Sequence, residues 1–143
     1  MPFEYRSDIA HADVAFDAWA PTLEELFREA ARATMQVMVE NPEQIRQAQT
    51  LALKLEQENE EMLLFDFLNE LIFYKDARRL VLLPGEMSIT PSDGGLTVRA
   101  TLSGEEIDPT RHEMGIDVKA VTMLRYKVEQ VAQRWQATVV LDV

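Results

Sequence analysis

The last nine residues of the chain alternate between two kinds of side chain, and this alternation constrains the fold most. Residues 135–143 have the sequence WQATVVLDV. Side chains on a β-strand point to opposite faces in turn, so alternate residues from Trp135 to Val143 would share one apolar face. Aromatic and β-branched residues favour a pleated, half-buried surface. We therefore predict an ordered strand over residues 135–143, with one face packed against a core.

Asp142 stands directly before the last residue, Val143. Its side-chain carboxylate and the terminal carboxylate would repel each other, and a hard cation bound between them would relieve that repulsion. The alternative is an exposed aspartate beside a frayed terminus. This stretch leaves both interpretations open.

The length and charge of the chain narrow the functional classes. The 143 residues suit a single domain over residues 1–143. The net charge is −11, from 25 acidic and 14 basic residues, and such a surface repels phosphate backbones. We therefore expect no direct nucleic-acid binding, and favour a basic protein partner or a divalent cation. The absence of cysteine excludes disulfides, thiolate zinc sites and cysteine nucleophiles.

The first residues lack a basic start followed by an apolar run, which argues against a secretory leader. No apolar stretch is long enough to span a membrane. We expect a cytoplasmic protein without membrane association.

Two helices are indicated by apolar residues at helical spacing. Thr22 and Glu25 form a capping-box pattern at the start of the first helix, and Asn41-Pro42 ends it. The second helix, residues 60–76, is apolar around much of its circumference and should be largely buried. Asn69 and Glu70 are polar exceptions, and Glu70 is expected to reach solvent.

The remaining pattern indicates strands separated by turns. Strands are predicted over residues 13–19, 50–56, 80–83, 87–90, 96–102, 116–121, 126–131 and 135–143. A hairpin near residues 133–134 would join the last two. We predict an α+β fold in which two helices pack on one face of a mainly antiparallel β-sheet.

No arrangement of nucleophile, base and acid is evident in the sequence. His11-Ala12-Asp13 could supply metal ligands at the start of a strand, or Asp13 could cap backbone amides in a turn. Lys119 could serve a site or be a solvated lysine. The residues alone do not choose between these interpretations.

Four separated stretches resemble the archease family, small proteins that activate RtcB-type RNA-splicing ligases. The stretches follow the family's order over nearly the whole chain. They are Ala12-Asp13-Val14 with Ala18-Trp19; Thr22 to Phe27 with Ala30-Ala31; Glu61 to Leu71; and Lys119-Ala120-Val121-Thr122 followed by Trp135, Ala137 and Val140 to Val143.

The resemblance implies a cation site and no catalytic residue. The family's two metal-binding aspartates fall on Asp13 and Asp142, and the terminal carboxylate of Val143 would be a third oxygen donor. All-oxygen ligation suits calcium, with magnesium as the alternative, better than zinc. The family's functional lysine falls on Lys119.

The resemblance also implies a non-catalytic activator in tRNA splicing. Its partner ligase would use Mn²⁺ and GTP to guanylylate an active-site histidine. The ligase would then join RNA ends bearing a 2′,3′-cyclic phosphate or 3′-phosphate to 5′-hydroxyl ends. The activator would promote guanylylation and multiple turnover.

The chain departs from the family pattern at two places. Ala10-His11 stands where the family usually has His-Thr, and Met123-Leu124 stands where it often has Tyr-His. No histidine role near Lys119 is therefore implied. Two other functions are compatible with these residues: a metal-dependent hydrolase whose cation activates water, and a general chaperone or adaptor with an apolar patch at Trp19 or Phe73.

Overall fold

The computed structural model describes residues 2–7 and 13–143, and within them the chain forms two α-helices and seven β-strands. A short 3-10 turn at Pro42–Gln44 follows the first helix. The elements in chain order are β1 (Phe3–Arg6), β2 (Val14–Ala20), α1 (Leu23–Met38), β3 (Gln49–Gln57), α2 (Glu60–Arg78), β4 (Leu80–Ser92), β5 (Gly95–Glu106), β6 (Ala120–Val131) and β7 (Arg134–Asp142).

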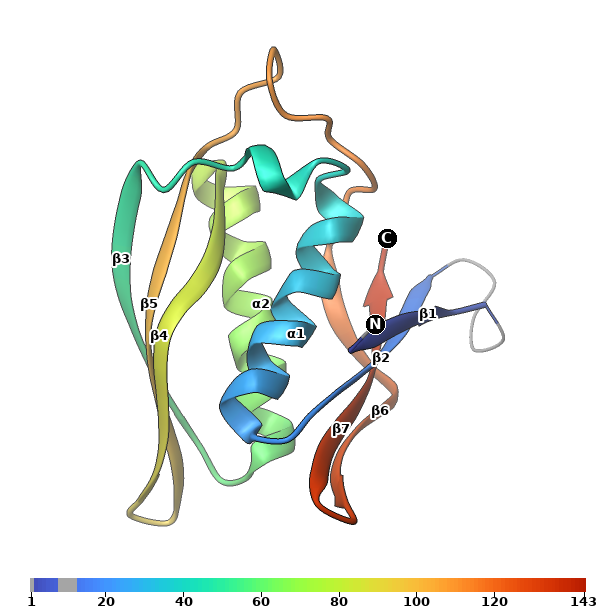
Figure 1. Ribbon diagram of the computed structural model, residues 1–143, viewed down its shortest axis with the longest axis vertical. Helices are drawn as coiled ribbons and strands as arrows, with labels where there is room; N and C mark the ends of the chain where they lie inside the picture. Colours follow the sequence, from blue (N-terminus) through green and yellow to red (C-terminus); the bar gives the residue numbers. More distant parts are fainter. Residues whose placement is uncertain (1, 8–12) are drawn as a thin grey trace.

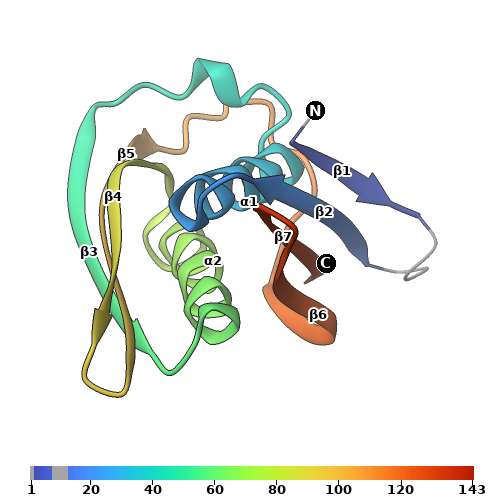
Figure 2. The same ribbon diagram turned by 60° about the horizontal axis from the view of Figure 1, so that its bottom comes forward.

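The described strands form two antiparallel sheets. One has the order β1-β2-β7-β6 and the other the order β3-β5-β4. The two helices lie between them, as Figures 1 and 2 show. The predicted α+β class with two helices and antiparallel strands is confirmed, and the strands are divided between two sheets instead of forming one.

The composition of α2 explains why two sheets are needed. Its buried side chains face several directions and are Leu63, Leu64, Phe67, Leu68, Leu71, Ile72 and Lys75. A helix that is apolar around its circumference must be covered on more than one side. α2 contacts β6 of the four-stranded sheet and β3, β4 and β5 of the three-stranded sheet, so both sheets cover it.

Neither described helix has the length and apolar character needed to cross a membrane.

The first helix begins as predicted and ends earlier. The Thr22 side chain accepts a hydrogen bond from the Glu25 backbone N–H at 3.2 Å. The helix ends at Met38, before Asn41, because Val39 has already left the helical conformation and forms a β-bridge with Met114.

The main differences from the predicted strands lie in β4, in β6 and in the segment before β6. Residues 80–83 and 87–90 belong to one strand, β4, which contains an irregularity between Pro84 and Met87. The strand predicted over 116–121 begins only at Ala120. The backbone N–H groups of Gly115 and Ile116 instead bind the carbonyl groups of Met38 and Val37 at the end of α1. β6 then continues to Val131 through an irregularity between Thr122 and Lys127, so residues 126–131 are not a separate strand.

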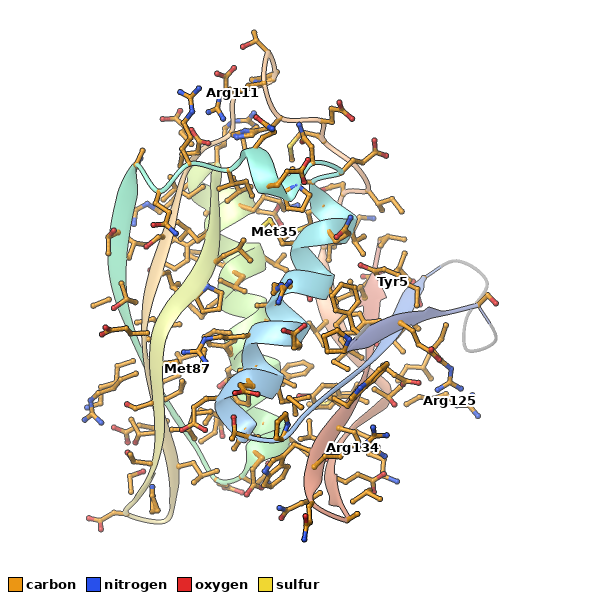
Figure 3. All side chains as sticks on the ribbon, in the orientation of Figure 1. Tyr5, Met35, Met87, Arg111, Arg125 and Arg134 are labelled. Carbon is orange, nitrogen blue, oxygen red and sulfur yellow. The ribbon has the colours of Figure 1, made fainter. Side chains whose placement is uncertain are left out.

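The loop after β5 is held by a buried carboxylate, Glu105. Arg111 and His112 bind its two oxygens, and the Arg46 backbone N–H donates to it at 2.6 Å. His112 Nδ1 accepts the Asp108 N–H, so Nε2 carries the proton that is donated to Glu105. These contacts tie the loop to the segment that follows α1. Arg111 is labelled at this end of the molecule in Figure 3, and Met35 lies in the interior beneath it.

The charge of Glu105 makes a pH-dependent contribution to folding. Its hydrogen bond from Arg111 lowers the pKa of Glu105 from 4.5 to about 2, against the opposing effect of burial. A carboxyl whose pKa is lower in the folded state stabilises that state above its unfolded pKa. The contribution is therefore present above pH 4.5 and lost as the pH falls towards about 2.

We expect Glu105→Gln to lower the free energy of unfolding at pH 7 by about 1–3 kcal/mol, because Arg111 loses its charged partner. Between pH 4.5 and about 2, the free energy of unfolding should also fall less in the variant than in the wild type. Urea denaturation at a series of pH values measures both effects. Glu106→Gln, a change at the neighbouring exposed residue, is the matched control. Equal pH profiles for the two variants would contradict the assignment.

Candidate functional site

The register between β2 and β7 brings the two predicted metal-binding aspartates to the same place. The paired residues run from Val14 with Leu141 to Ala20 with Trp135. Asp13 precedes Val14, and Asp142 follows Leu141, so both stand one residue beyond the last β2–β7 pair. Directly opposed residues in antiparallel strands have Cβ atoms about 4.5–5.5 Å apart and share a face. The two carboxylates therefore leave the sheet from adjacent strand ends.

The alternation of the strands determines the direction of these carboxylates. Phe16 and Val139 are register partners, are fully buried and face the helices. Asp13 stands three residues before Phe16, and Asp142 stands three residues after Val139. Because side chains alternate along a strand, both aspartates point to the face turned away from the helices. Asp142 is exposed, while Asp13 and Val143 are half-buried. The acidic pair is open to solvent and does not belong to the core.

Lys119 is held next to this pair by the backbone. Its N–H donates to the Asp142 carbonyl oxygen at 2.8 Å, and the following residue, Ala120, pairs with Asp142 in the sheet. The side chain of Lys119 is exposed. Asp13, Asp142 and Lys119, which the sequence placed far apart, thus come from neighbouring segments at one end of the four-stranded sheet.

Asn69 of α2 positions the start of β6. Its side-chain oxygen accepts the Val121 backbone N–H at 2.9 Å. In the sequence this amide interrupts an apolar helix, and in the fold it supplies a hydrogen bond where β6 begins. A lone carboxamide within a buried apolar helix was the signal in the sequence, although its partner, 52 residues later, could not be identified.

Lys75, also on α2, fixes the segment that leads to Lys119. Its ammonium group contacts Asp117 at 2.7 Å, Asp76 at 2.8 Å and the Val118 carbonyl oxygen at 3.1 Å. Burial acts against the charged form, but the hydrogen bonds to Asp117 and Asp76 outweigh it and raise the pKa of Lys75. The same contact with Lys75 lowers the pKa of Asp117. Sequence reasoning missed this ion pair.

The acidic end has donors suited to a hard cation. Among residues 2–7 and 13–143, no three His, Asp or Glu side chains are grouped so that they could hold a metal ion. The candidate set is therefore two carboxylates, from Asp13 and Asp142, with a main-chain oxygen of Val143. Oxygen donors of this kind fit calcium or magnesium, with water completing the coordination. His11, also considered as a ligand, lies outside the described residues.

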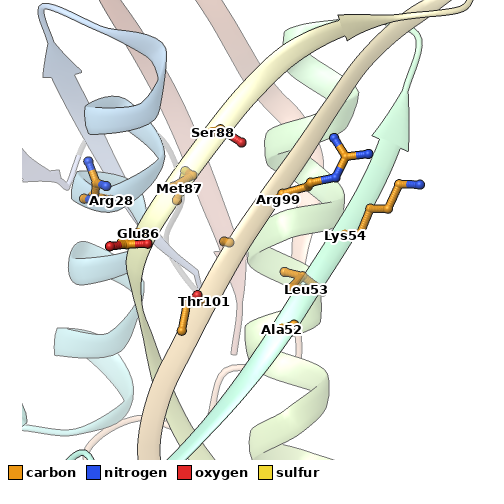
Figure 4. Close-up of a pocket in the computed structure, with 10 residues that line it drawn as sticks. Arg28, Ala52, Leu53, Lys54, Glu86, Met87, Ser88, Arg99 and Thr101 are labelled. Atoms are coloured by element: carbon orange, nitrogen blue, oxygen red, sulfur yellow. The ribbon is translucent and has the colours of Figure 1, made fainter.

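A hollow lies away from the acidic pair, on the three-stranded sheet. Its volume is about 740 Å³, and Figure 4 shows the side chains around it. Lys54, Arg99 and Ser88 form one row across the three strands. Arg28 reaches the hollow from α1 and donates to the Gly85 carbonyl oxygen at 3.0 and 3.1 Å. This hollow is distinct from the acidic strand ends.

Comparison with known proteins identifies the family. The sequence model of the archease protein family matches residues 3–143. The chain belongs to the archease family. The archease of Pyrococcus furiosus is 35% identical over 133 residues, which cover 92% of this chain and 93% of that protein. The archease of Methanopyrus kandleri is 34% identical, with 99% of each chain covered.

Solved structures share the archease fold. The solution structure of Methanobacterium thermoautotrophicum protein 1598 is 32% identical, with 99% of each chain covered and a TM-score of 0.83. The crystal structure of an archease from Thermotoga maritima, described as a possible chaperone, has a TM-score of 0.65 and 22% identity, with 98% of each chain covered. At that identity the second likeness shows the fold alone.

We expect Asn69→Ala to lower the free energy of unfolding by about 1–3 kcal/mol, because the Val121 N–H loses its acceptor. Hydrogen exchange at the Val121 amide should accelerate. Asn69→Asp keeps an oxygen acceptor and should recover most of the protection. Unchanged exchange in Asn69→Ala would show that this hydrogen bond does not hold the start of β6.

Proposed function

We propose that this archease is a non-catalytic activator of an RtcB-type RNA-splicing ligase, and that it acts through a divalent cation held by Asp13 and Asp142. Two findings support the proposal. The chain belongs to the archease family over residues 3–143, and the β2–β7 register brings the two aspartates to one strand end. The register is the observation that carries the proposal, because it brings two aspartates from opposite ends of the sequence to adjacent strand ends.

The acidic end suits a role in binding. Asp13, Asp142 and a main-chain oxygen of Val143 would hold the cation, calcium first and magnesium as the alternative. A bound cation would supply positive charge that can position phosphate or carboxylate oxygens. Lys119 adds a second, exposed positive charge next to Asp142. The described residues of this end provide carboxylates and an ammonium group, which can orient a partner's groups without forming a covalent bond.

The partner is a ligase that guanylylates its own histidine with GTP and Mn²⁺ and then joins RNA ends. In this proposal, the acidic end of the archease contacts the region around the ligase active site and promotes guanylylation and turnover. The acidic chain carries a net charge of −11, so it complements the positive surface that an enzyme handling RNA and GTP presents.

We expect Asp13→Asn and Asp142→Asn each to weaken Ca²⁺ binding by at least about tenfold, or about 1.4 kcal/mol, because each removes an anionic donor. Isothermal titration calorimetry measures the affinity, and thermal unfolding with and without Ca²⁺ or Mg²⁺ provides a second readout. Asp93→Asn, in the exposed turn between β4 and β5, is the matched control and should bind like wild type. The cation site is wrong if wild type and all three variants give the same titration.

We expect wild-type protein to increase the number of RNA-joining turnovers per ligase in an assay with purified ligase, GTP and Mn²⁺. Asp13→Ala, Asp142→Ala and Lys119→Ala should reduce this stimulation, because each removes a charged group from the proposed contact. Asp93→Asn should stimulate like wild type. Equal turnover with wild type and with Asp13→Ala or Asp142→Ala would refute the proposal.

Two further measurements separate this function from its alternatives. Cation-dependent hydrolysis in the absence of ligase, lost in Asp13→Ala, would identify a metal-dependent hydrolase instead. Suppression of aggregation of unrelated proteins would identify a general chaperone. Of the two aromatic residues considered for such a chaperone, Phe73 is 54% exposed, whereas Arg134 lies over the ring of Trp19.

A further inference from the structure

Exposed apolar side chains are concentrated in segments beside the acidic end. In the described part of the chain, Ile116 is 48% exposed and Met123 and Leu124 are each 53% exposed. Ile116 lies three residues before Lys119, and Met123 lies three residues after Ala120, the register partner of Asp142. Exposed apolar groups gathered around charged residues mark interaction surfaces more often than scattered ones do.

A small groove forms on one side of the acidic pair. Its volume is about 250 Å³, and Tyr5, Val14 and Ile116 contribute apolar side chains to its lining. Val14 directly follows Asp13 and, like Phe16, lies on the helix-facing side of β2, so the groove and the acidic pair lie on opposite faces of the same strand end. Gln36 and Glu40 of the segment around the end of α1 supply a polar edge. The groove is large enough for one apolar side chain of a partner.

Two hydrogen bonds and one close backbone approach keep this groove in shape. The Ile116 N–H donates to the Val37 carbonyl oxygen at 2.9 Å, and the Tyr5 hydroxyl donates to the Ala33 carbonyl oxygen at 2.7 Å. A Cβ atom at Gly115 would lie 2.5 Å from the Val37 carbonyl oxygen, so glycine is required for this close approach. A preformed groove loses little conformational entropy when a partner binds.

A protruding bulge of β6 forms the second apolar feature. Thr122 pairs with Val140 and Lys127 pairs with Thr138, so residues 123–126 stand opposite the single residue Val139. The extra residues leave the ladder and expose Met123, Leu124 and Arg125. Figure 3 shows Arg125 pointing away from the body of the protein.

The bulge is held at both ends. The Leu124 N–H donates to the Thr122 hydroxyl at 3.0 Å, and the Tyr126 hydroxyl donates to the Glu61 carbonyl oxygen at 2.5 Å. Arg125 has a φ of 52°, a left-handed conformation that costs energy in a residue other than glycine. Such strain persists only where surrounding contacts impose it, so the bulge is a defined part of the fold.

We propose that the groove and the bulge form the docking surface for the ligase, on either side of the acidic pair. This inference rests on the proposed function. The groove would receive an apolar side chain of the ligase, and Met123 and Leu124 would pack on its surface. Asp13 and Asp142 would then face the positive rim of a phosphate-handling active site. Protein interfaces commonly combine an apolar core of anchor residues with a polar, charged rim.

We expect Leu124→Asp and Ile116→Asp each to raise the Kd for the ligase by about tenfold or more, because each places a charge where an apolar side chain should be buried. Both residues are about half exposed, so thermal unfolding should stay close to wild type. Biolayer interferometry with immobilised ligase measures the affinity, and the turnover assay measures stimulation. The Ca²⁺ titration of both variants should match wild type, which separates docking from cation binding.

Val131→Asp is the matched control. Val131 is 43% exposed and lies on β6, at the end of the strand far from the bulge. The change adds the same charge to the same strand, and binding to the ligase should be unaffected. Equal loss of affinity in Val131→Asp and Leu124→Asp would mean that added negative charge, not the docking surface, causes the effect.

Other outcomes separate this inference from the proposed function. If Leu124→Asp and Ile116→Asp bind like wild type while Asp13→Ala abolishes stimulation, the docking surface is wrong and the activator function stands. If wild-type protein neither binds nor stimulates the ligase, both proposals fail. If wild type is a dimer in sedimentation and Leu124→Asp is a monomer, the surface joins two copies of this chain, and the proposed docking role is overturned.

Discussion

The register between β2 and β7 is the interaction on which the rest of the structure depends. A shift of one residue would turn Phe16 and Val139 to solvent and bring Asp13 and Asp142 towards the helices. Burial of the apolar partners therefore also determines the face on which the carboxylates emerge. The core and the candidate site are consequences of the same pairing, which explains how residues 129 positions apart form one acidic end.

The polar side chains of α2 extend this constraint to β6. Asn69 binds the Val121 N–H, and Lys75 binds Asp117 and the Val118 carbonyl oxygen. These two residues lie nearly two helical turns apart on a helix that both sheets cover. Buried polar groups are costly unless they are hydrogen-bonded, so their partners must take fixed positions. The segment containing Lys119 is thereby placed beside Asp142.

Several elements followed directly from local patterns. The alternating stretches at residues 13–19, 50–56 and 135–143 are strands within one or two residues of the expected bounds, and the cap at Thr22 was identified from its spacing to Glu25. In residues 116–119 apolar and charged side chains alternate, a pattern that predicts a strand. These residues form a loop because their backbone groups bind the end of α1, a contact that no local pattern shows. The bulge of β6 was missed for the same reason, since register belongs to a pair of strands.

The sequence by itself determined which segments have the spacing of helices and which have the alternation of strands. It also determined the acidic charge, the α+β class and the residues through which the chain resembles the archease family. These depend on side-chain types and on their spacing along one segment. Only the tertiary structure decided that the strands form two sheets around the helices, that Asn69 and Lys75 hold the start of β6, and that Asp13 and Asp142 stand at adjacent strand ends. The physical reason is that pairing between distant segments is selected by burial of the whole apolar surface, which no single segment contains.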